Sequence, residues 1–196
     1  MLTANKISLK PIELSDCELL QHLMNDPLIT GKTVGWNFPV SLHSQENFIR
    51  SLTTSQKDYR LVIMENESQK NIGITGLWDI DWQSRSARSG IKLLPPYMNK
   101  GYGAETIMLM TAWAFYSVGL RRLYAEILAM NQPSLALYTK KCQWRLEGTE
   151  REATFKAGEW HDLHNIAILK HEFDQLQEAQ KYIHFVCPNN HTPTTN

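Results

Sequence analysis

The sequence contains few cysteines and no long apolar run. Cys17, Cys142 and Cys187 are the three cysteines of 196 residues, and their wide separation excludes a metal-binding pair or a disulfide framework. No apolar stretch reaches the roughly 18 residues that a membrane span needs, and residues 1–6 lack the apolar core of a signal peptide. We therefore expect a cytoplasmic protein with reduced thiols and no membrane partner.

The sequence also lacks an excess charge, internal repeats and a linker. Its 20 basic and 20 acidic residues cancel, which argues against a nucleic-acid partner. Residues 161 and 164 of a strand would point to opposite faces, so His161 and His164, with His171 nearby, do not form a recognisable metal site. We expect one domain, no metal and a small or local partner.

Apolar periodicity predicts the secondary structure. The expected strands cover residues 7–11, 59–64, 71–78, 89–94, 123–128, 144–154 and 160–169. The expected helices cover residues 16–24, 44–52, 104–117, 133–141 and 172–186, and residues 188–196 are expected to be disordered. This order predicts an α/β (α+β) fold with a mixed central sheet of about six to seven strands flanked by helices.

Two stretches offer candidate acceptor-binding residues. Residues 30–40 combine glycine and proline with Trp36 and Phe38, which predicts an irregular loop carrying two large rings. Asp79 and Asp81 share a strand face and would suit a cationic acceptor, although a polar strand end is the commoner explanation.

The connection from residue 94 into the long helix has the character of an anion site. Gly101 and Gly103 let the backbone come close to a ligand, and a helix start supplies unpaired N–H groups and a partial positive charge. A pyrophosphate fits this description, whereas a simple connecting turn is the alternative. Thr106 stands where a dinucleotide-binding motif needs its third glycine, and neither Gly101 nor Gly103 is followed by the Lys-Ser or Lys-Thr that ends a P-loop.

Residues 96–105, Pro-Tyr-Met-Asn-Lys-Gly-Tyr-Gly-Ala-Glu, resemble the coenzyme A loop of GNAT N-acetyltransferases. The branch is that of ribosomal-protein N-terminal and spermidine acetyltransferases. The resemblance extends to residues 72–73 and 79–87, to Asn131, Ser134 and Tyr138, and to the hairpin at 147–162, covering roughly residues 5–173. It implies a single GNAT domain over residues 1–173, splayed around acetyl-CoA, with a C-terminal extension over 174–196.

The resemblance also implies which residues hold the cofactor. These are Leu93, Leu94, Met98, Asn99, Lys100, Gly101, Tyr102, Gly103, Ala104, Asn131 and Ser134. Met98 stands where the family usually has Arg or Gln, so main-chain donors must carry more of the phosphate contact. Gln143-Trp144 replaces the family's Gly-Phe, with one extra residue before it.

In the same branch a glutamate acts as base and a tyrosine as acid, and these positions are Glu126 and Tyr138 here. Direct attack of the amine within a ternary complex is implied. The thioester carbonyl is expected to be polarised by a main-chain N–H near Leu93 or Leu94. Each residue also has a structural explanation: Glu126 as a solvated strand charge, Tyr138 as a core aromatic, and Asn131 as a helix cap.

The acceptor is predicted to be a primary amine. An α-amine has a pKa near 7.7–8.0, against about 10.4 for a lysine-like nitrogen, so a protein or peptide N-terminus needs only a modest base. Acetylation of a polyamine, aminoglycoside or amino sugar is the alternative. A non-catalytic acyl-CoA-binding domain and a nucleotide binder of another kind are alternatives of a different class. The chain is expected to be a monomer or homodimer.

Overall fold

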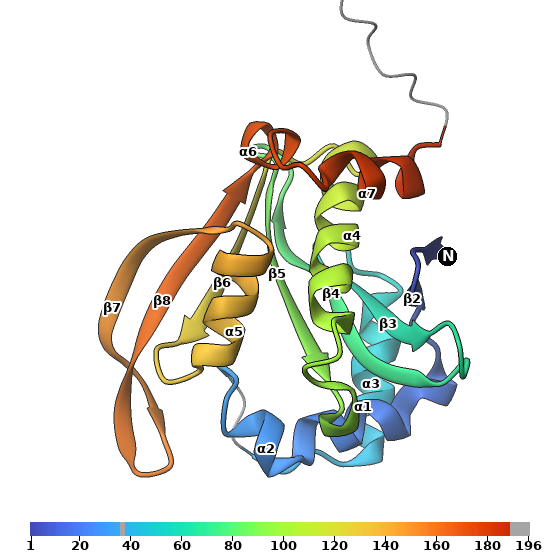
Figure 1. Ribbon diagram of the computed structural model, residues 1–196. Helices are drawn as coiled ribbons and strands as arrows, with labels where there is room; N and C mark the ends of the chain where they lie inside the picture. Colours follow the sequence, from blue (N-terminus) through green and yellow to red (C-terminus); the bar gives the residue numbers. More distant parts are fainter. Residues whose placement is uncertain (36–37, 189–196) are drawn as a thin grey trace, which may run out of the picture.

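A computed structural model describes residues 1–35 and 38–188. Within these residues eight strands form one sheet in the order β1-β2-β3-β4-β5-β6-β8-β7 (Figure 1). Their bounds are β1 Leu2–Thr3, β2 Ile7–Pro11, β3 Tyr59–Glu65, β4 Asn71–Asp81, β5 Ser86–Leu93, β6 Arg122–Leu128, β7 Arg145–Lys156 and β8 Glu159–Leu169. The predicted mixed sheet is confirmed. The strand β1 was not predicted, because two residues are too few to show an alternation of apolar and polar side chains.

Helices cover both faces of this sheet. The α-helices are α1 Cys17–Asn25, α2 Pro27–Thr30, α3 Leu42–Leu52, α4 Tyr102–Tyr116, α5 Gln132–Ala136, α6 Lys170–Asp174 and α7 Ala179–Val186. Short 3-10 turns are η1 Leu14–Asp16 and η2 Pro95–Tyr97, and η3 Leu137–Lys141 is a π-helical turn. In Figure 1, α4 and α7 lie in front of the sheet, and α1 and α3 lie behind it. No helix in the described residues is long and apolar enough to cross a bilayer.

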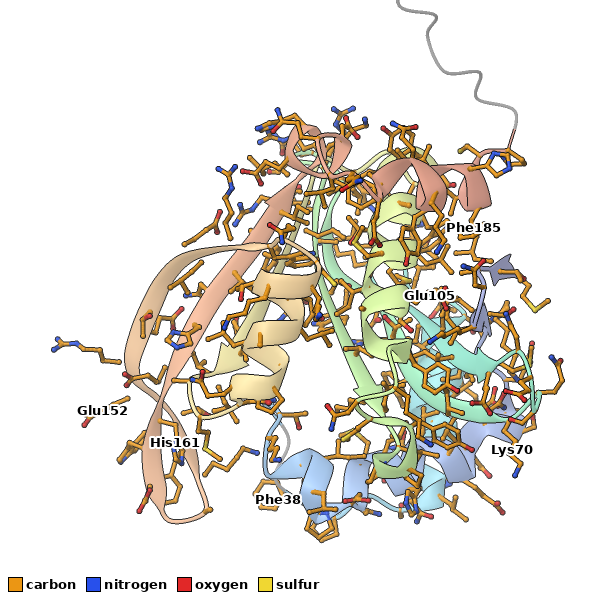
Figure 2. The ribbon with its side chains drawn as sticks, viewed as in Figure 1. Phe38, Lys70, Glu105, Glu152, His161 and Phe185 are labelled. Carbon is orange, nitrogen blue, oxygen red and sulfur yellow. The ribbon has the colours of Figure 1, made fainter. Side chains whose placement is uncertain are left out.

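The long helix α4 is the centre of the core. It is apolar around most of its circumference, which is typical of a helix buried on all sides. It packs against β2, β4 and β5 on one side and α7 on the other. Its one charged residue, Glu105, is buried and accepts the N–H groups of Asn5 at 3.2 Å and Lys6 at 2.8 Å (Figure 2). These bonds tie the N-terminal segment to the first turn of α4.

The segment after residue 173 shares this core. The sequence predicts one helix over residues 172–186, but the structure has two, α6 and α7, separated by a turn. Phe173 and Ile183 are both buried, and the break allows both side chains to reach the core. The described part of the predicted C-terminal extension therefore packs directly on α4.

The parallel strands β5 and β6 separate along their length. They pair only at Ser86↔Arg122, Ala87↔Leu123 and Arg88↔Tyr124. Beyond these pairs β5 stays with β4, and β6 stays with β8, so each strand keeps its outer neighbour. The carboxyl ends of β5 and β6 diverge towards α2 in Figure 1. Carboxyl ends of parallel strands are a usual place for ligands in α/β sheets.

Candidate active site

The loop between β5 and α4 presents main-chain donors. Gly101 has φ 90°, in the left-handed region that favours glycine, and Asn99 has φ 60°, which asparagine tolerates. Within the described residues, the N–H groups of residues 99–104 have no intramolecular acceptor. With the helix dipole behind them, these six amides make an anion site.

The amides on either side of these six are used within the protein. The N–H of Met98 donates to the Pro95 carbonyl at 3.2 Å, and that of Glu105 donates to the Gly101 carbonyl at 3.2 Å. Both amides are therefore used within the protein, since one closes η2 and the other begins the ladder of α4. The available donors run from residue 99 to residue 104, so the Met98 N–H is not free to bind a phosphate, and any contact of Met98 with the cofactor stays a prediction.

Side chains hold this loop from outside. The Tyr102 hydroxyl donates to Glu65, and this hydrogen bond raises the pKa of Tyr102 to about 12. The Lys100 ammonium lies 5.7 Å from the centre of the Tyr97 ring. Lys6 donates to the Lys100 carbonyl at 3.4 Å, which brings a second cation to the loop. Sequence analysis missed Lys6 because 94 residues separate it from its partner.

Gly103 lies where three elements meet. A Cβ atom at this position would be 3.0 Å from Cδ2 of Leu137 in η3 and 3.9 Å from Cδ1 of Leu93 in β5. Because Gly103 has no side chain, the first turn of α4 comes close to both neighbours. A larger residue would press on Leu137 and force the first turn of α4 or η3 to move.

The end of β5 distinguishes the two predicted carbonyl-polarising residues. The N–H of Leu94 donates to the Ile72 carbonyl at 2.9 Å. In antiparallel pairing the hydrogen-bonding direction alternates, so the N–H of Leu93 points away from β4 and towards the gap beside β6. The N–H of Leu93 is therefore the one available for the predicted role, since that of Leu94 is used within the sheet.

A cavity of about 810 Å³ opens at the gap between β5 and β6. Its walls come from β4, β5 and β6, from α1 and α3, and from the loop after α2. Glu126, Asn131, Ser134 and Tyr138 all line it, although they come from a strand, a helix and the turn η3. The structure thus brings together four of the predicted site residues in one cavity.

Tyr138 combines a buried ring with a hydroxyl on the cavity. The residue is 3% exposed, and its ring packs edge-on against Trp144 with centroids 4.9 Å apart. Within the described residues its hydroxyl makes no hydrogen bond, and burial raises the pKa of this phenol well above its ordinary 10.0. The group therefore remains protonated at neutral pH and is free to donate into the cavity.

The extra residue noted beside Trp144 has a structural counterpart. The turn η3 is π-helical, with the Cys142 N–H donating to the Leu137 carbonyl at 3.1 Å. A π-helical turn accommodates one additional residue in a helix and is frequent at functional sites. Here the widened turn carries Tyr138, so the insertion occurs at the residue predicted to act as acid.

Glu126 is held by an ion pair. Its carboxylate accepts a hydrogen bond from Arg88 on the neighbouring strand, and Arg88 also lies 4.0 Å from Asp79. The side chain of Glu126 is 27% exposed. Glu126 is therefore an oriented group on the cavity wall, in contact with water, and does not project freely into solvent.

Asn131 acts as a helix cap. Its Oδ1 accepts the N–H of Ser134 at 3.2 Å at the start of α5, and its Nδ2 donates to the Lys32 carbonyl at 2.7 Å. These two bonds connect α5 with the loop after α2. Asn131 and Ser134 contribute to the cavity wall, and their predicted contact with the cofactor arm stays a prediction.

The cavity also contains cations that sequence analysis did not select. Its lining carries Lys32, Arg60, Arg88 and Lys92, against the single carboxylate of Glu126. Lys92 is the most perturbed: burial, and then the positive charges of Arg60 and Lys156, lower its pKa from 10.5 to about 8. Side chains alternate between the two faces of a strand, so positions 88 and 92 lie on the same face of β5. This spacing in the sequence could have identified Arg88 and Lys92 as neighbours, but it could not have identified Lys32 or Arg60.

Three of the four predicted acceptor residues are described by the structure, and these three lie outside the cavity wall. Trp36 is not among the described residues. Phe38 is 70% exposed beside α2, at the lower edge of the molecule in Figure 2. Asp79 is 64% exposed, and Asp81 accepts the Ser84 N–H at 2.9 Å to shape the β4–β5 turn. None of these three lines the cavity, so direct acceptor contact remains a prediction for them.

Comparison with known proteins identifies the family. Residues 6–141 match the acetyltransferase (GNAT) domain family, which is more than half of the chain. The chain belongs to the GNAT acetyltransferase family. It is therefore an acetyl-CoA-dependent enzyme that acetylates an amine, and the predicted fold, activity and cofactor are confirmed.

Individual relatives are distant. An uncharacterized N-acetyltransferase, p20, of Bacillus licheniformis is 25% identical over 174 residues, covering 88% of this chain and 97% of the relative. Spermidine N(1)-acetyltransferase of Vibrio cholerae is 24% identical over 170 residues, covering 86% and 96%. The crystal structure of a spermidine N-acetyltransferase from Vibrio cholerae with CoA and spermine superposes with a TM-score of 0.80 at 22% identity, covering 85% and 97%. The superposition supports the fold.

The residues present fit acetyl-CoA. The six free amides and the start of α4 suit a diphosphate, and the small size of Gly103 leaves room beside them. The gap between β5 and β6 exposes the Leu93 N–H next to the cavity that Tyr138 lines. Within the described residues there is no group of three or more His, Cys, Asp or Glu side chains suited to hold a metal ion.

Proposed function

We propose that this enzyme acetylates the α-amine of a protein or peptide N-terminus. The supporting observation is the single cavity that joins the end of β5, the carboxylate of Glu126 and the hydroxyl of Tyr138. The amides of residues 99–104 would hold the diphosphate of acetyl-CoA, which supplies the acetyl group as a thioester. The Leu93 N–H would donate to the thioester carbonyl and stabilise negative charge on that oxygen.

Tyr138 is the proposed general acid. Its phenol is protonated at neutral pH because burial raises its pKa, and its hydroxyl is not engaged by another described residue. It would give its proton to the departing thiolate as the carbon–sulfur bond breaks. The packing of its ring on Trp144 fixes the direction of the hydroxyl.

Glu126 is the proposed acceptor of the amine proton. One of its carboxylate oxygens is held by Arg88, which leaves the other for a water molecule or for the amine itself. As the nitrogen attacks, its proton would pass to this carboxylate directly or through the water. An α-amine with a pKa near 8 is already about a tenth neutral at pH 7, so it places a small demand on the base.

Polyamine acetylation is the second candidate, supported by the similarity to spermidine N(1)-acetyltransferase. A polyamine carries several positive charges, and it would have to bring them beside Arg60, Arg88 and Lys92. An N-terminal α-amine brings one charge at most. The charge balance of the cavity lining therefore favours the α-amine over the polyamine.

An acceptor screen tests this proposal. Purified enzyme would be given acetyl-CoA with short peptides, spermidine, an aminoglycoside or an amino sugar, and release of free CoA thiol would be followed. We expect the peptides to give the highest kcat/KM, and Tyr138→Phe to lower it. Faster turnover of spermidine would contradict the proposed acceptor. CoA binding without thiol release from any amine would favour a non-catalytic acyl-CoA-binding domain.

A further inference from the structure

The cavity has a positive charge that the chain as a whole does not have. The sequence is neutral overall, with 20 basic and 20 acidic residues, yet the lining contains four basic side chains and one acidic one. Two of these cations have carboxylate partners. Arg60 lies 2.6 Å from Asp58, and Arg88 pairs with Glu126. The remaining positive charge comes from Lys92 and Lys32.

Lys92 lacks an anionic partner within the described residues. Its Nζ contacts the thioether of Met24 on α1 at 2.9 Å, and a thioether is a weak acceptor. Two charged groups act on it, Arg60 on β3 and Lys156 on β7; both are positive and lower its pKa further than burial alone does. A partly buried cation without an anionic partner is costly, and an anionic ligand at this position would offset that cost.

Its position in the sheet indicates what the charge serves. Lys92 pairs with Ile74 on β4 and precedes Leu93, whose N–H faces the gap at β6. Its side chain points to the opposite face from Leu93, towards α1 and the cavity. Arg60 lies on the same cavity, stacked on the Trp78 ring at 4.1 Å. An anion bound between these two side chains would be part of the acceptor side of the site.

We propose that the acceptor is an amine that itself carries an anionic group, a carboxylate or a phosphate, bound by Lys92 and Arg60. This proposal rests on the proposed acetyltransfer and specifies its substrate class. An N-terminal residue with an acidic or phosphorylated side chain has this chemistry, as does a free amino acid. A polyamine does not, because it would add positive charge beside an unpaired cation.

Matched acceptors test the preference in the wild-type enzyme. C-terminally amidated peptides would differ only in the first residue, with Asp against Asn and phosphoserine against serine. Comparing alanine with alaninamide would test recognition of a free α-carboxylate. Because the amines of the two compounds differ in pKa, their rates would be divided by the concentration of the neutral amine. We expect the anionic member to have kcat/KM higher by about tenfold or more, mainly through KM, because charge-assisted hydrogen bonds are the strong ones. The pair with the largest ratio identifies the anion.

Lys92→Met tests the residue, because it removes the charge and keeps the length of the side chain. It should abolish the preference by raising KM for the anionic member, while kcat on the neutral member is retained. Lys92→Arg should restore part of the preference. The control is Lys70→Met, which removes a lysine from the turn before β4, at the outer edge of the molecule in Figure 2. A melting curve of each variant checks that it is folded.

The outcomes separate this proposal from the proposed function. Thiol release with equal kcat/KM for both members of every pair would overturn the anionic acceptor and leave N-terminal acetylation intact, whereas spermidine as the best acceptor would overturn both. A Lys92→Met enzyme that keeps the preference would also overturn it. Equal loss of kcat on every acceptor would place Lys92 in the chemical step instead. No thiol release with any amine would overturn both proposals.

Discussion

Removing the buried cation at position 92 should make the protein more stable at neutral pH. In the folded protein the pKa of Lys92 falls from 10.5 to about 8 because of burial and the charges of Arg60 and Lys156. At about 1.4 kcal/mol per pH unit this difference corresponds to about 3 kcal/mol, and partial access to water reduces it to about 2 kcal/mol. Lys92→Met should raise the free energy of unfolding by this amount, which corresponds to an increase of about 4–8 °C in Tm for a chain of this length.

The pH dependence gives the prediction its sign. Below pH 8 both folded and unfolded wild-type chains hold the proton, so the cost of the buried ammonium is fully present. Between about pH 8 and 10.5 the unfolded chain binds more protons than the folded one, so wild-type stability rises relative to the variant. Melting curves of wild type, Lys92→Met and Lys70→Met at about pH 6.5, 8 and 9.5 would measure this difference. A variant that is less stable than wild type at the lowest pH, or equally more stable at all three, would refute the reasoning.

Three further results are expected. Gly103→Val should weaken CoA binding by about a hundredfold, since its side chain would press on Leu137 and displace the first turn of α4, which carries free amides. Gly148→Val, whose Cβ meets nothing within 4 Å, is the control and should bind CoA as the wild type does. Titration calorimetry would measure both affinities, and equal values would contradict the loop assignment. Tyr138→Phe should lower kcat by about a hundredfold or more with unchanged CoA affinity, and an unchanged kcat would remove its role as acid. The preference of the wild-type enzyme for an anionic over a matched neutral acceptor should fall as pH rises through about 8, because Lys92 then loses its proton; a constant ratio would argue against Lys92 as the anion-binding group.

The sequence predicted the features that local patterns determine. The alternating apolar positions predicted the seven longer strands, and the continuous apolar character of residues 104–117 predicted the buried helix α4. The glycines at 101 and 103 predicted the anion loop, because an unusual backbone at a helix start needs those residues. Glu126 and Tyr138 could be selected only by resemblance, since neither has a local signature.

Features that depend on packing between distant segments were not predictable. Lys6 reaches the loop from 94 residues away, and Lys92 is unusual only because α1 and two other cations surround it. Whether Leu93 or Leu94 offers its N–H depends on the hydrogen-bonding alternation with β4, and a sequence does not specify that register. The insertion before Trp144 was visible as an extra residue, but its form as a π-helical turn was not.

The most direct test of the account is a crystal structure of this protein with CoA. We expect the diphosphate within hydrogen-bonding distance, about 2.7–3.2 Å, of several N–H groups of residues 99–104, and the thiol beside the Tyr138 hydroxyl. A diphosphate bound elsewhere, or these amides paired with acceptors of the protein itself, would contradict the central claim.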